Sequence, residues 1–378
     1  MRKRLTMFEL LQKGRSIVVE PAEGATLLEA LAGEPPVAIS APCGGRGRCG
    51  KCVVRVLDPD PAPPPSEADK RFISELRLAV GYRLACTCDA AAVRQVEAPQ
   101  EYREATVKGD LPHFSAPAQP SSKGVAAGPL AAAVDIGTTT VAVFLIDTAT
   151  GEAIDVLSRM NRQSVYGADV LSRIAHSDGG GLPALSRAIR AQIQEMLWEL
   201  TDRNDAGLTD VGLVSVAGNT TMLHFLAGED PSGIGRAPFT PIFMESREYA
   251  PEKLTLPLAE EGAVVLLPSV SAYVGADIVS AAVAVEMDRD ERTTLLVDIG
   301  TNGELALRHE GRIYACSTAA GPAFEGASIS SGVGGIAGAI RSWERSGQRF
   351  RFDTIGGSEP VGVCGSGLLD LLSTLIRD

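Results

Sequence analysis

The chain has 378 residues, of which 45% are hydrophobic, and a formal net charge of −12 at neutral pH. This length suffices for two or three domains with sizeable cores, and the acidic balance excludes a protein that binds nucleic acid through a broadly basic surface. No run of eighteen apolar residues occurs, and the basic start at residues 1–4 precedes a mixed segment rather than the apolar core of a signal peptide. We therefore expect a cytoplasmic protein with no membrane partner.

The first hundred residues have the pattern of a small α+β domain. Apolar periodicity predicts strands and one helix, in the order strand 5–11, strand 16–19, helix 27–31 and strand 53–57. The five prolines within 59–65 exclude a helix or a central strand and predict an exposed loop. Ser66 is then expected to cap a helix over 67–73, and Gly81 lets the chain turn back.

Four cysteines in this part have a specific spacing. Cys43, Cys49 and Cys52 are separated by five and two residues within a glycine-rich run, and Cys86 ends the segment Arg-Leu-Ala-Cys. The set resembles the ligands of plant-type and adrenodoxin-like [2Fe–2S] ferredoxins, in which one loop supplies three thiolates and a separate segment the fourth. Glycine permits the turns that such a loop needs. The resemblance implies a β-grasp ferredoxin domain with a [2Fe–2S] cluster bound by these four residues.

Other interpretations of the cysteines stay open. Cys88 is close enough in sequence to compete as the fourth ligand, and the preference for Cys86 rests on the ferredoxin resemblance. A zinc knuckle would use Cys-x2-Cys at both ends, whereas the second pair here is Cys-x-Cys. A disulfide framework is typical of small secreted chains. Cys316 and Cys364 stand alone, and we expect both to be buried small side chains.

A segment rich in Pro, Ser, Gly and Ala follows the ferredoxin-like part, from about residue 97 to residue 128. This composition predicts a solvated, semi-rigid linker. Such a linker would let a redox domain move between an electron donor and an acceptor, or it would be a simple spacer.

Two copies of one motif follow the linker, at residues 132–147 and 295–307. Each is a buried apolar strand, a tight Asp-x-Gly-Thr turn and a second strand. Glycine lets the backbone approach phosphate oxygens, threonine hydroxyls donate to them, and the aspartate can hold hydrated Mg²⁺. The candidate catalytic carboxylates are Asp135 and Asp298. The candidate phosphate-binding residues are Gly137, Thr138, Thr139, Thr140, Gly300, Thr301, Asn302 and Gly303.

The paired hairpins resemble those of the acetate and sugar kinase, Hsp70 and actin (ASKHA) superfamily, in which ATP lies between two ribonuclease-H-like halves. The resemblance implies an α/β ATPase fold and a small-residue helix across the cleft, for which 268–282 is the candidate. Asp277 in this segment either orients water or metal or is a capping or solvated carboxylate. A third cluster at 217–226 opens a helix whose N-terminal donors would line the cleft.

The fusion closely resembles the reductive activators of corrinoid proteins, from about residue 5 to the last residue. In that family, ATP binding and hydrolysis assist one-electron reduction of a Co(II) corrinoid to the Co(I) state used in methyl transfer. The resemblance implies a [2Fe–2S] cluster, ATP with Mg²⁺, a corrinoid protein of a methyltransferase system and a low-potential electron donor, and it is compatible with a homodimer.

Four parts are expected along the chain: a ferredoxin domain at 1–98, a linker at 99–129, a middle domain with the first phosphate hairpin at 130–206 and an ASKHA core at 207–378. Members of the family continue beyond this point, so a truncated chain is expected. Two other functions stay open. One is a small-molecule kinase with a redox-sensing ferredoxin domain, and the other is a [2Fe–2S] electron carrier with an inactive, partner-binding ATPase part.

Overall fold

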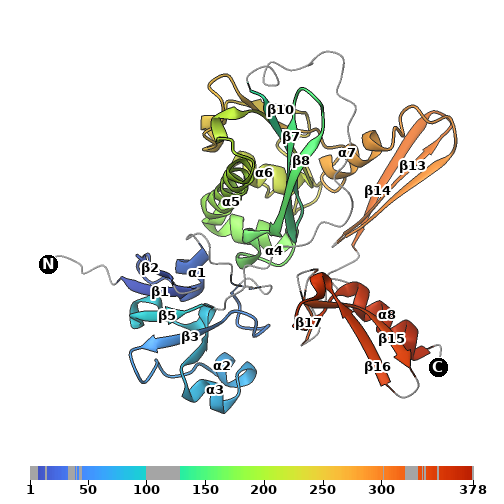
Figure 1. Ribbon diagram of the computed structural model, residues 1–378. Coiled ribbons are helices and arrows are strands. Elements are labelled where there is room, and N and C mark those ends of the chain that lie inside the picture. The colour runs from blue at the N-terminus through green and yellow to red at the C-terminus, as the bar shows by residue number, and fades with distance from the viewer. Residues whose placement is uncertain are drawn as a thin grey trace. The chain divides into compact units, whose positions relative to one another are not determined.

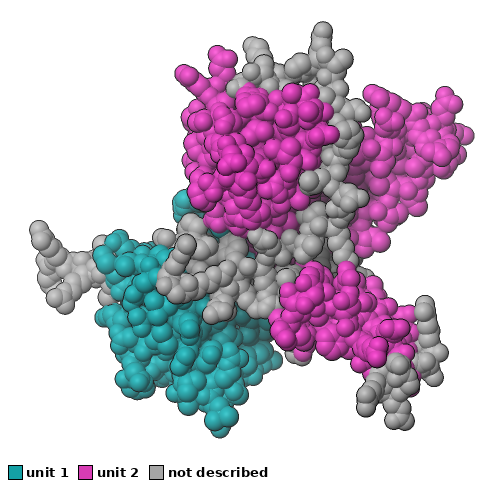
Figure 2. All heavy atoms as spheres, in the orientation of Figure 1, with its two compact units in different colours: residues 1–102, 162–189 teal, residues 103–161, 190–378 magenta. Residues whose placement is uncertain are grey.

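The computed structural model (Figure 1) describes residues 7–12, 15–32, 39, 41, 45–98, 128–300, 302–319, 331–333, 335, 338–346 and 349–376. The chain divides into two compact units, which Figure 2 distinguishes by colour. The first comprises residues 1–102 and 162–189, and the second comprises residues 103–161 and 190–378. Among the described residues, no helix combines the length and the apolar character needed to cross a bilayer.

The first unit contains a five-stranded mixed sheet. Its strands are β1 (Phe8–Gln12), β2 (Arg15–Val19), β3 (Val53–Asp58), β4 (Tyr82–Leu84) and β5 (Gln95–Glu97). Their order in the sheet is β2-β1-β5-β3-β4. β1 pairs antiparallel with β2 and parallel with β5, and β3 runs antiparallel to β4 and β5. This is the β-grasp arrangement predicted for the ferredoxin domain.

Helices pack around this sheet. They are α1 (Leu27–Ala32), α2 (Glu67–Phe72) and α3 (Glu75–Ala79). Helix α4 (Val170–His176) also belongs to this unit. Leu27 and Leu31, four residues apart on α1, are fully buried in one core with Leu10 of β1. Ser66 caps α2 as predicted, since its hydroxyl accepts a hydrogen bond from the Asp69 N–H. Val165 joins the same core, so residues distant in sequence complete this unit.

The second unit is organised around a six-stranded sheet. Its strands are β6 (Leu130–Ile136), β7 (Thr140–Asp147), β8 (Ala153–Met160), β9 (Val211–Gly218), β10 (Arg247–Tyr249) and β11 (Ala263–Leu266). The order is β10-β11-β9-β6-β7-β8. β6 and β7 form the predicted hairpin, and β9 lies parallel to β6 on its other side. Alternate residues of β6 are buried, which gives the sheet its apolar core.

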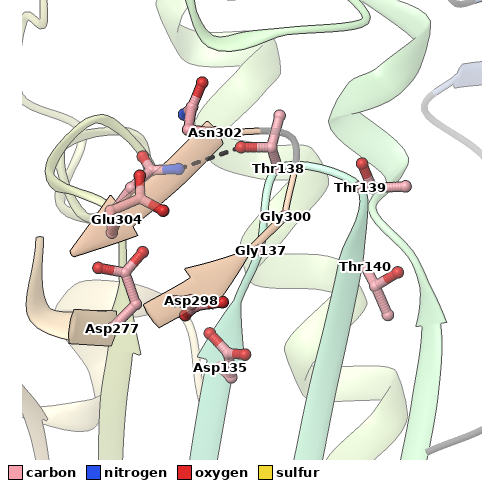
Figure 3. A pocket seen from close by; sticks show the side chains of 11 residues that line it. Asp135, Gly137, Thr138, Thr139, Thr140, Asp277, Asp298, Gly300, Asn302 and Glu304 are labelled. Carbon is pink, nitrogen blue, oxygen red and sulfur yellow. Dashed lines mark hydrogen bonds between the residues drawn. The ribbon is translucent and has the colours of Figure 1, made fainter. Parts of the chain in front are cut away.

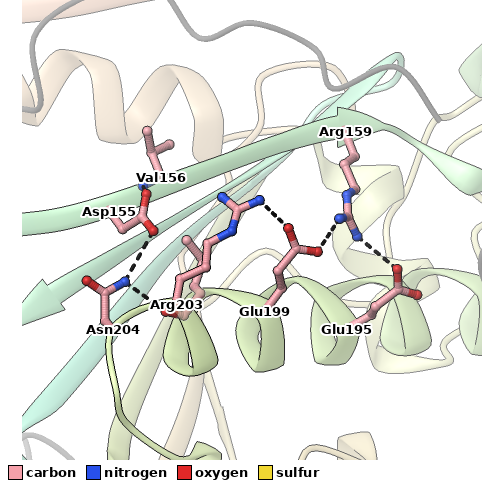
Figure 4. Close-up of polar contacts among 8 residues, drawn as sticks. Asp155, Val156, Arg159, Glu195, Glu199, Arg203 and Asn204 are labelled. Carbon is pink, nitrogen blue, oxygen red and sulfur yellow. Dashed lines mark hydrogen bonds and ion pairs between the residues drawn. The ribbon is translucent and has the colours of Figure 1, made fainter.

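Three helices belong with this sheet: α5 (Leu182–Arg203), α6 (Thr220–Ala227) and α7 (Ala276–Ala284). Figure 4 shows how α5 is fixed to β8. Arg159 of β8 donates to Glu195 at 2.8 Å and also to Glu199, and Glu199 in turn accepts from Arg203. The Arg159 side chain is buried, and its charge is balanced within a network of two arginines and two glutamates.

Two small sheets follow. The first has the order β12 (Thr294–Ile299), β13 (Asn302–His309) and β14 (Arg312–Ala319). The second consists of β15 (Ala339–Ser346), β16 (Arg349–Thr354) and β17 (Gly362–Val363), and helix α8 (Gly365–Ile376) packs on β15. β12 and β13 are the predicted second hairpin. Ile299 of β12 and Ile376 of α8 are strongly exposed, so both elements present apolar side chains to solvent.

The structure corrects two predictions of this region. The helix expected over 268–282 begins only at Ala276, because Gly275 is its extended N-cap and Ser271 bridges to Val274 in a tight turn before it. Cys364 is buried as expected, but Cys316 is exposed because it lies on β14, an edge strand of a small sheet.

Candidate cluster and nucleotide sites

The paired ends of β3 and β4 bring two of the predicted cluster cysteines together. Val53 pairs with Leu84 in this ladder, and the Ala85 N–H donates to the Cys52 carbonyl at 2.7 Å. Cys52 directly precedes β3, and Cys86 lies in a short 3₁₀ turn after β4. Their sulfur atoms are 3.3 Å apart and both side chains are buried. The strand pairing therefore brings these two cysteines together.

The loop before Cys52 is bent by glycines in left-handed conformations. Gly45, Gly47 and Gly50 have φ of 75°, 64° and 67°. At Gly50 the space is also restricted, because an added Cβ would lie 2.6 Å from the Phe72 ring. Only glycine meets both conditions, so the loop lies tightly against α2.

The contact with Cys52 distinguishes Cys86 from Cys88, the other candidate for the fourth ligand. The Cys52 thiol donates to Cys86 and lowers the pKa of Cys86 to about 7, helped by a hydrogen bond from the Gly47 N–H. The same contact raises the pKa of Cys52. Burial, followed by the charge of Asp69, raises the pKa of Cys88 to about 11. Cys86 is thus the cysteine that contacts Cys52, while Cys88 is buried.

The third described cysteine of the set, Cys49, is half-buried and lies in the same loop. Cys43 lies outside the described residues. Within the described part of the chain, no group of three or more His, Cys, Asp or Glu is arranged as a complete metal site. The contacting sulfurs and the left-handed loop nonetheless fit the donor chemistry of a [2Fe–2S] cluster, and the four-cysteine ligand set stays a prediction.

A buried carboxylate positions the segment that carries Cys86. Asp69 of α2 is 2% exposed and accepts hydrogen bonds from the Leu84 N–H at 2.6 Å and from the Ser66 N–H at 2.7 Å. The Thr87 hydroxyl donates to the Leu84 carbonyl and accepts a hydrogen bond from the Ser66 hydroxyl. Asp69 thereby connects α2 to the residues on either side of Cys86. No local sequence pattern indicates this role of Asp69, because it depends on a contact with Leu84, fifteen residues away.

The second candidate site is a cavity of about 240 Å³ in the second unit, seen close up in Figure 3. The turns of the two predicted phosphate hairpins line it together. The lining residues are Asp135, Gly137, Thr138, Thr139, Thr140, Asn219, Asp277, Asp298, Gly300, Asn302 and Glu304. Gly303 does not line the cavity, and Thr301 lies outside the described residues. The cavity thus gathers the three candidate carboxylates and most of the candidate phosphate-binding residues.

Carboxylates crowd one another in this cavity. Partial burial raises the pKa of Asp135 to about 6, and the charges of Asp277 and Asp298 add to the shift. Burial and Asp298 also raise the pKa of Asp277. Glu304 lies directly opposite Asp298 in the ladder of β12 and β13, and burial followed by Asp277 and Asp298 raises its pKa to about 7. Like charges in such positions repel, so a bound cation would relieve the site.

Polar donors complete the cavity. Asn219 caps α6, accepting from the Met222 N–H, and its amide donates to the Thr138 hydroxyl at 3.1 Å. At Gly137 an added Cβ would lie 2.7 Å from the Thr140 carbonyl oxygen, so a side chain would distort the first turn. Glu304 was missed as a site residue, although its position two residues after Asn302 on one strand places both on the same face.

Family models match three consecutive parts of the chain. The model of a 2Fe–2S iron–sulfur cluster binding domain matches residues 10–91, the RACo middle region matches 130–290, and the C-terminal domain of RACo, the ASKHA domain, matches 292–378.

Two curated relatives and one solved structure are similar over much of the chain. The corrinoid activation enzyme RamQ of Eubacterium limosum is 33% identical over 248 residues, which are 65% of this chain and 42% of the relative. The [Co(II) methylated amine-specific corrinoid protein] reductase of Methanosarcina barkeri is 24% identical over 65% of this chain and 50% of its own length. This chain therefore spans half or less of these relatives.

The solved structure is described as a reductive activator for corrinoid, iron–sulfur protein. It is 27% identical, covers 98% of this chain and 72% of its own chain, and has a TM-score of 0.62. The three family models lie between residue 10 and residue 378. The first covers the ferredoxin fold, and the residues that line the cavity fall within the other two. The chain therefore belongs to the RACo family, with a 2Fe–2S domain followed by the RACo middle region and the RACo C-terminal ASKHA domain.

Proposed function

We propose that the protein reductively activates a corrinoid protein in an ATP-dependent reaction, passing one electron to Co(II) to restore Co(I) for methyl transfer. The observation that carries the proposal is the combination, in one chain, of a ferredoxin fold with an acidic cavity between two phosphate-type hairpins. The names of the two curated relatives support the same activity. The proposed partners are a corrinoid protein of a methyltransferase system and a low-potential electron donor.

The first unit would hold the redox cofactor through Cys43, Cys49, Cys52 and Cys86. A [2Fe–2S] cluster, when bound, supplies the transferred electron. The protein contributes the sulfur ligands, a loop bent by left-handed glycines and the Gly47 N–H that donates to Cys86. Hydrogen bonds to the ligand sulfurs are one of the factors that set the potential of such centres.

The cavity of the second unit would bind ATP by its phosphates. Gly137 has no side chain, so phosphate oxygens could approach its backbone. Thr138, Thr139 and Thr140 of the first hairpin would donate hydrogen bonds to these oxygens. The second hairpin would contribute Gly300, Thr301, Asn302 and Gly303. Asn219 orients the Thr138 hydroxyl through its amide. The two turns would therefore hold the phosphates from opposite sides.

The crowded carboxylates support a magnesium ion in the same cavity. Mg²⁺ keeps several water ligands and is usually held by one or two carboxylates together with substrate phosphates. Asp135 and Asp298 occupy equivalent positions in the two hairpins and are the proposed carboxylates, with Asp277 orienting water. An ion held mainly through water fits the absence of a closed ligand set among the described residues.

Nucleotide binding need supply only a modest free energy to assist the reduction. A coupling of about 1–3 kcal/mol between two sites corresponds to roughly 40–130 mV for one electron. A plant-type cluster has a potential near about −400 mV, so such a shift changes the yield of a demanding reduction several-fold or more. The proposal therefore requires that ATP change the equilibrium or the rate of Co(I) formation.

The test follows Co(I) formation by absorbance in an anaerobic mixture of the reconstituted protein, a reductant and a corrinoid protein. We expect ATP to increase the rate by roughly 5–150-fold, the range of a coupling of about 1–3 kcal/mol, and Asp135→Asn to remove most of that increase. Asp147→Asn is the matched control, because Asp147 lies at the other end of the same hairpin and accepts from the Ala149 and Thr150 N–H groups. Equal rates and equal final yields of Co(I) with and without ATP would overturn the proposal.

A further inference from the structure

The loop with the cluster cysteines carries positive charge although the chain as a whole is acidic. Residues 45–52 contain two arginines and one lysine and no acidic residue, and both Arg46 and Arg48 are exposed. The complete chain has a formal net charge of −12. The positive charge is therefore a local property of this loop.

Helix α2 extends the positive charge. Gly50 of the loop packs against the Phe72 ring, and the guanidinium carbon of Arg71 lies 5.2 Å from the centroid of the same ring. Arg71 is exposed. The neighbouring Lys70 is compensated by Glu67 at 2.6 Å, so it adds little net charge. We use the name basic rim for the three exposed arginines Arg46, Arg48 and Arg71.

The basic rim lies close to the proposed ligands. Arg46 and Arg48 are positioned between Cys43 and Cys49 in the chain, and Gly47 between them donates to Cys86. Any protein that exchanges electrons with a cluster in this loop must approach the loop, because electron transfer slows steeply with distance. The partner's contact surface would therefore face these arginines.

We propose that the basic rim is the docking surface for the electron donor, and that this donor is a small carrier protein with an acidic surface around its own redox centre. Opposite charges raise the encounter rate and favour orientations in which the acidic surface of the carrier meets the basic rim. In the docked complex the carrier loses one electron and this protein gains one. The inference rests on the cluster part of the proposed function and is independent of the corrinoid acceptor.

The experiment compares the purified, cluster-loaded protein with the double variant Arg46→Glu/Arg48→Glu and the single variant Arg71→Glu. Arg289→Glu/Arg312→Glu is the matched control, since it changes the net charge equally at two exposed arginines of the other unit. The probe is a small acidic bacterial ferredoxin. Its dissociation constant is measured with both proteins oxidised at low salt, and cluster reduction by the reduced probe is followed by stopped flow.

We expect the double variant to weaken binding of the ferredoxin and to slow cluster reduction, each by about tenfold or more. The effects of Arg71→Glu should be smaller but in the same direction. Rates of the unmodified protein should fall with added salt, and reduction by the methyl viologen radical, a small cation, should not be slowed. Because Arg71 lies outside the loop, its variant keeps the test valid if the double variant loads no cluster. An effect no larger than that of the control would overturn the proposal, as would variants that slow only cobalt reduction.

Discussion

Replacing Asp69 with alanine tests how the segment around Cys86 is held. The change leaves the N–H groups of Leu84 and Ser66 without their acceptor, in a place where the carboxylate is 2% exposed. A buried donor without a partner costs about 1–3 kcal/mol, and loss of a helix cap costs about 0.5–2 kcal/mol. Because the Ser66 contact belongs to both contributions and is counted once, we expect a total loss of about 1.5–5 kcal/mol.

Equilibrium unfolding of the iron-free protein in guanidinium chloride measures this loss, and iron analysis after reconstitution measures its effect on the cluster. Asp69→Asn retains an acceptor for Leu84 but presents an amide to Ser66, so it should lose about half as much. Glu75→Ala is the control, since Glu75 is an exposed acidic residue in the first turn of α3, and should cost less than about 0.5 kcal/mol. A loss below about 1 kcal/mol for Asp69→Ala would show that the carboxylate does not hold this segment.

Three further changes test other parts of the structure. Gly50→Ala places a methyl group 2.6 Å from a ring in a left-handed conformation, so it should cost about 2–4 kcal/mol and reduce iron loading, and unchanged unfolding would contradict this. Arg159→Met removes the buried guanidinium that joins β8 to α5, so it should lower the free energy of unfolding by about 3 kcal/mol. Arg203→Met, at a more exposed ion pair, should lower it by less than about 1 kcal/mol. Equal losses of unfolding free energy for the two variants would be inconsistent with the network in Figure 4. The pKa values of Asp135 and Glu304 are raised to about 6 and about 7. The folded protein without a bound ion therefore holds protons that the unfolded chain releases, and it should lose stability as pH rises from about 4 to about 7. A cation that binds these carboxylates must displace the same protons. Titration calorimetry should therefore find weaker binding of Mg²⁺ with ATP as pH falls through this range, and a constant affinity would argue against these carboxylates.

Features set by local sequence could be predicted. The Asp-x-Gly-Thr turns are close in sequence to the strands they join, so their residues identify both hairpins and the carboxylates Asp135 and Asp298. The N-cap at Ser66 likewise depends on residues three positions away. The resemblance to ferredoxins favoured Cys86 over Cys88, and the contact between Cys86 and Cys52 agrees with that preference.

Features set by tertiary contacts could not be predicted. Asp69 reaches Leu84, and Asn219 reaches Thr138 across eighty-one positions, so no local pattern indicates either role. The inclusion of residues 162–189 in the ferredoxin-containing unit also depends on long-range packing. The exposure of Cys316 follows from which strands flank β14, information that residue type alone does not carry.

The identity of the sulfur ligands can be tested by electron paramagnetic resonance of the anaerobically reconstituted protein after dithionite reduction. The unmodified protein and Cys88→Ser should both give the signal of a reduced [2Fe–2S] cluster, with close to two irons per chain. Cys86→Ser should lose or strongly alter that signal, because the serine leaves Cys52 without its sulfur neighbour. A colourless unmodified protein without a signal, or a signal that depends on Cys88 and not on Cys86, would contradict the proposed redox function or its ligand set.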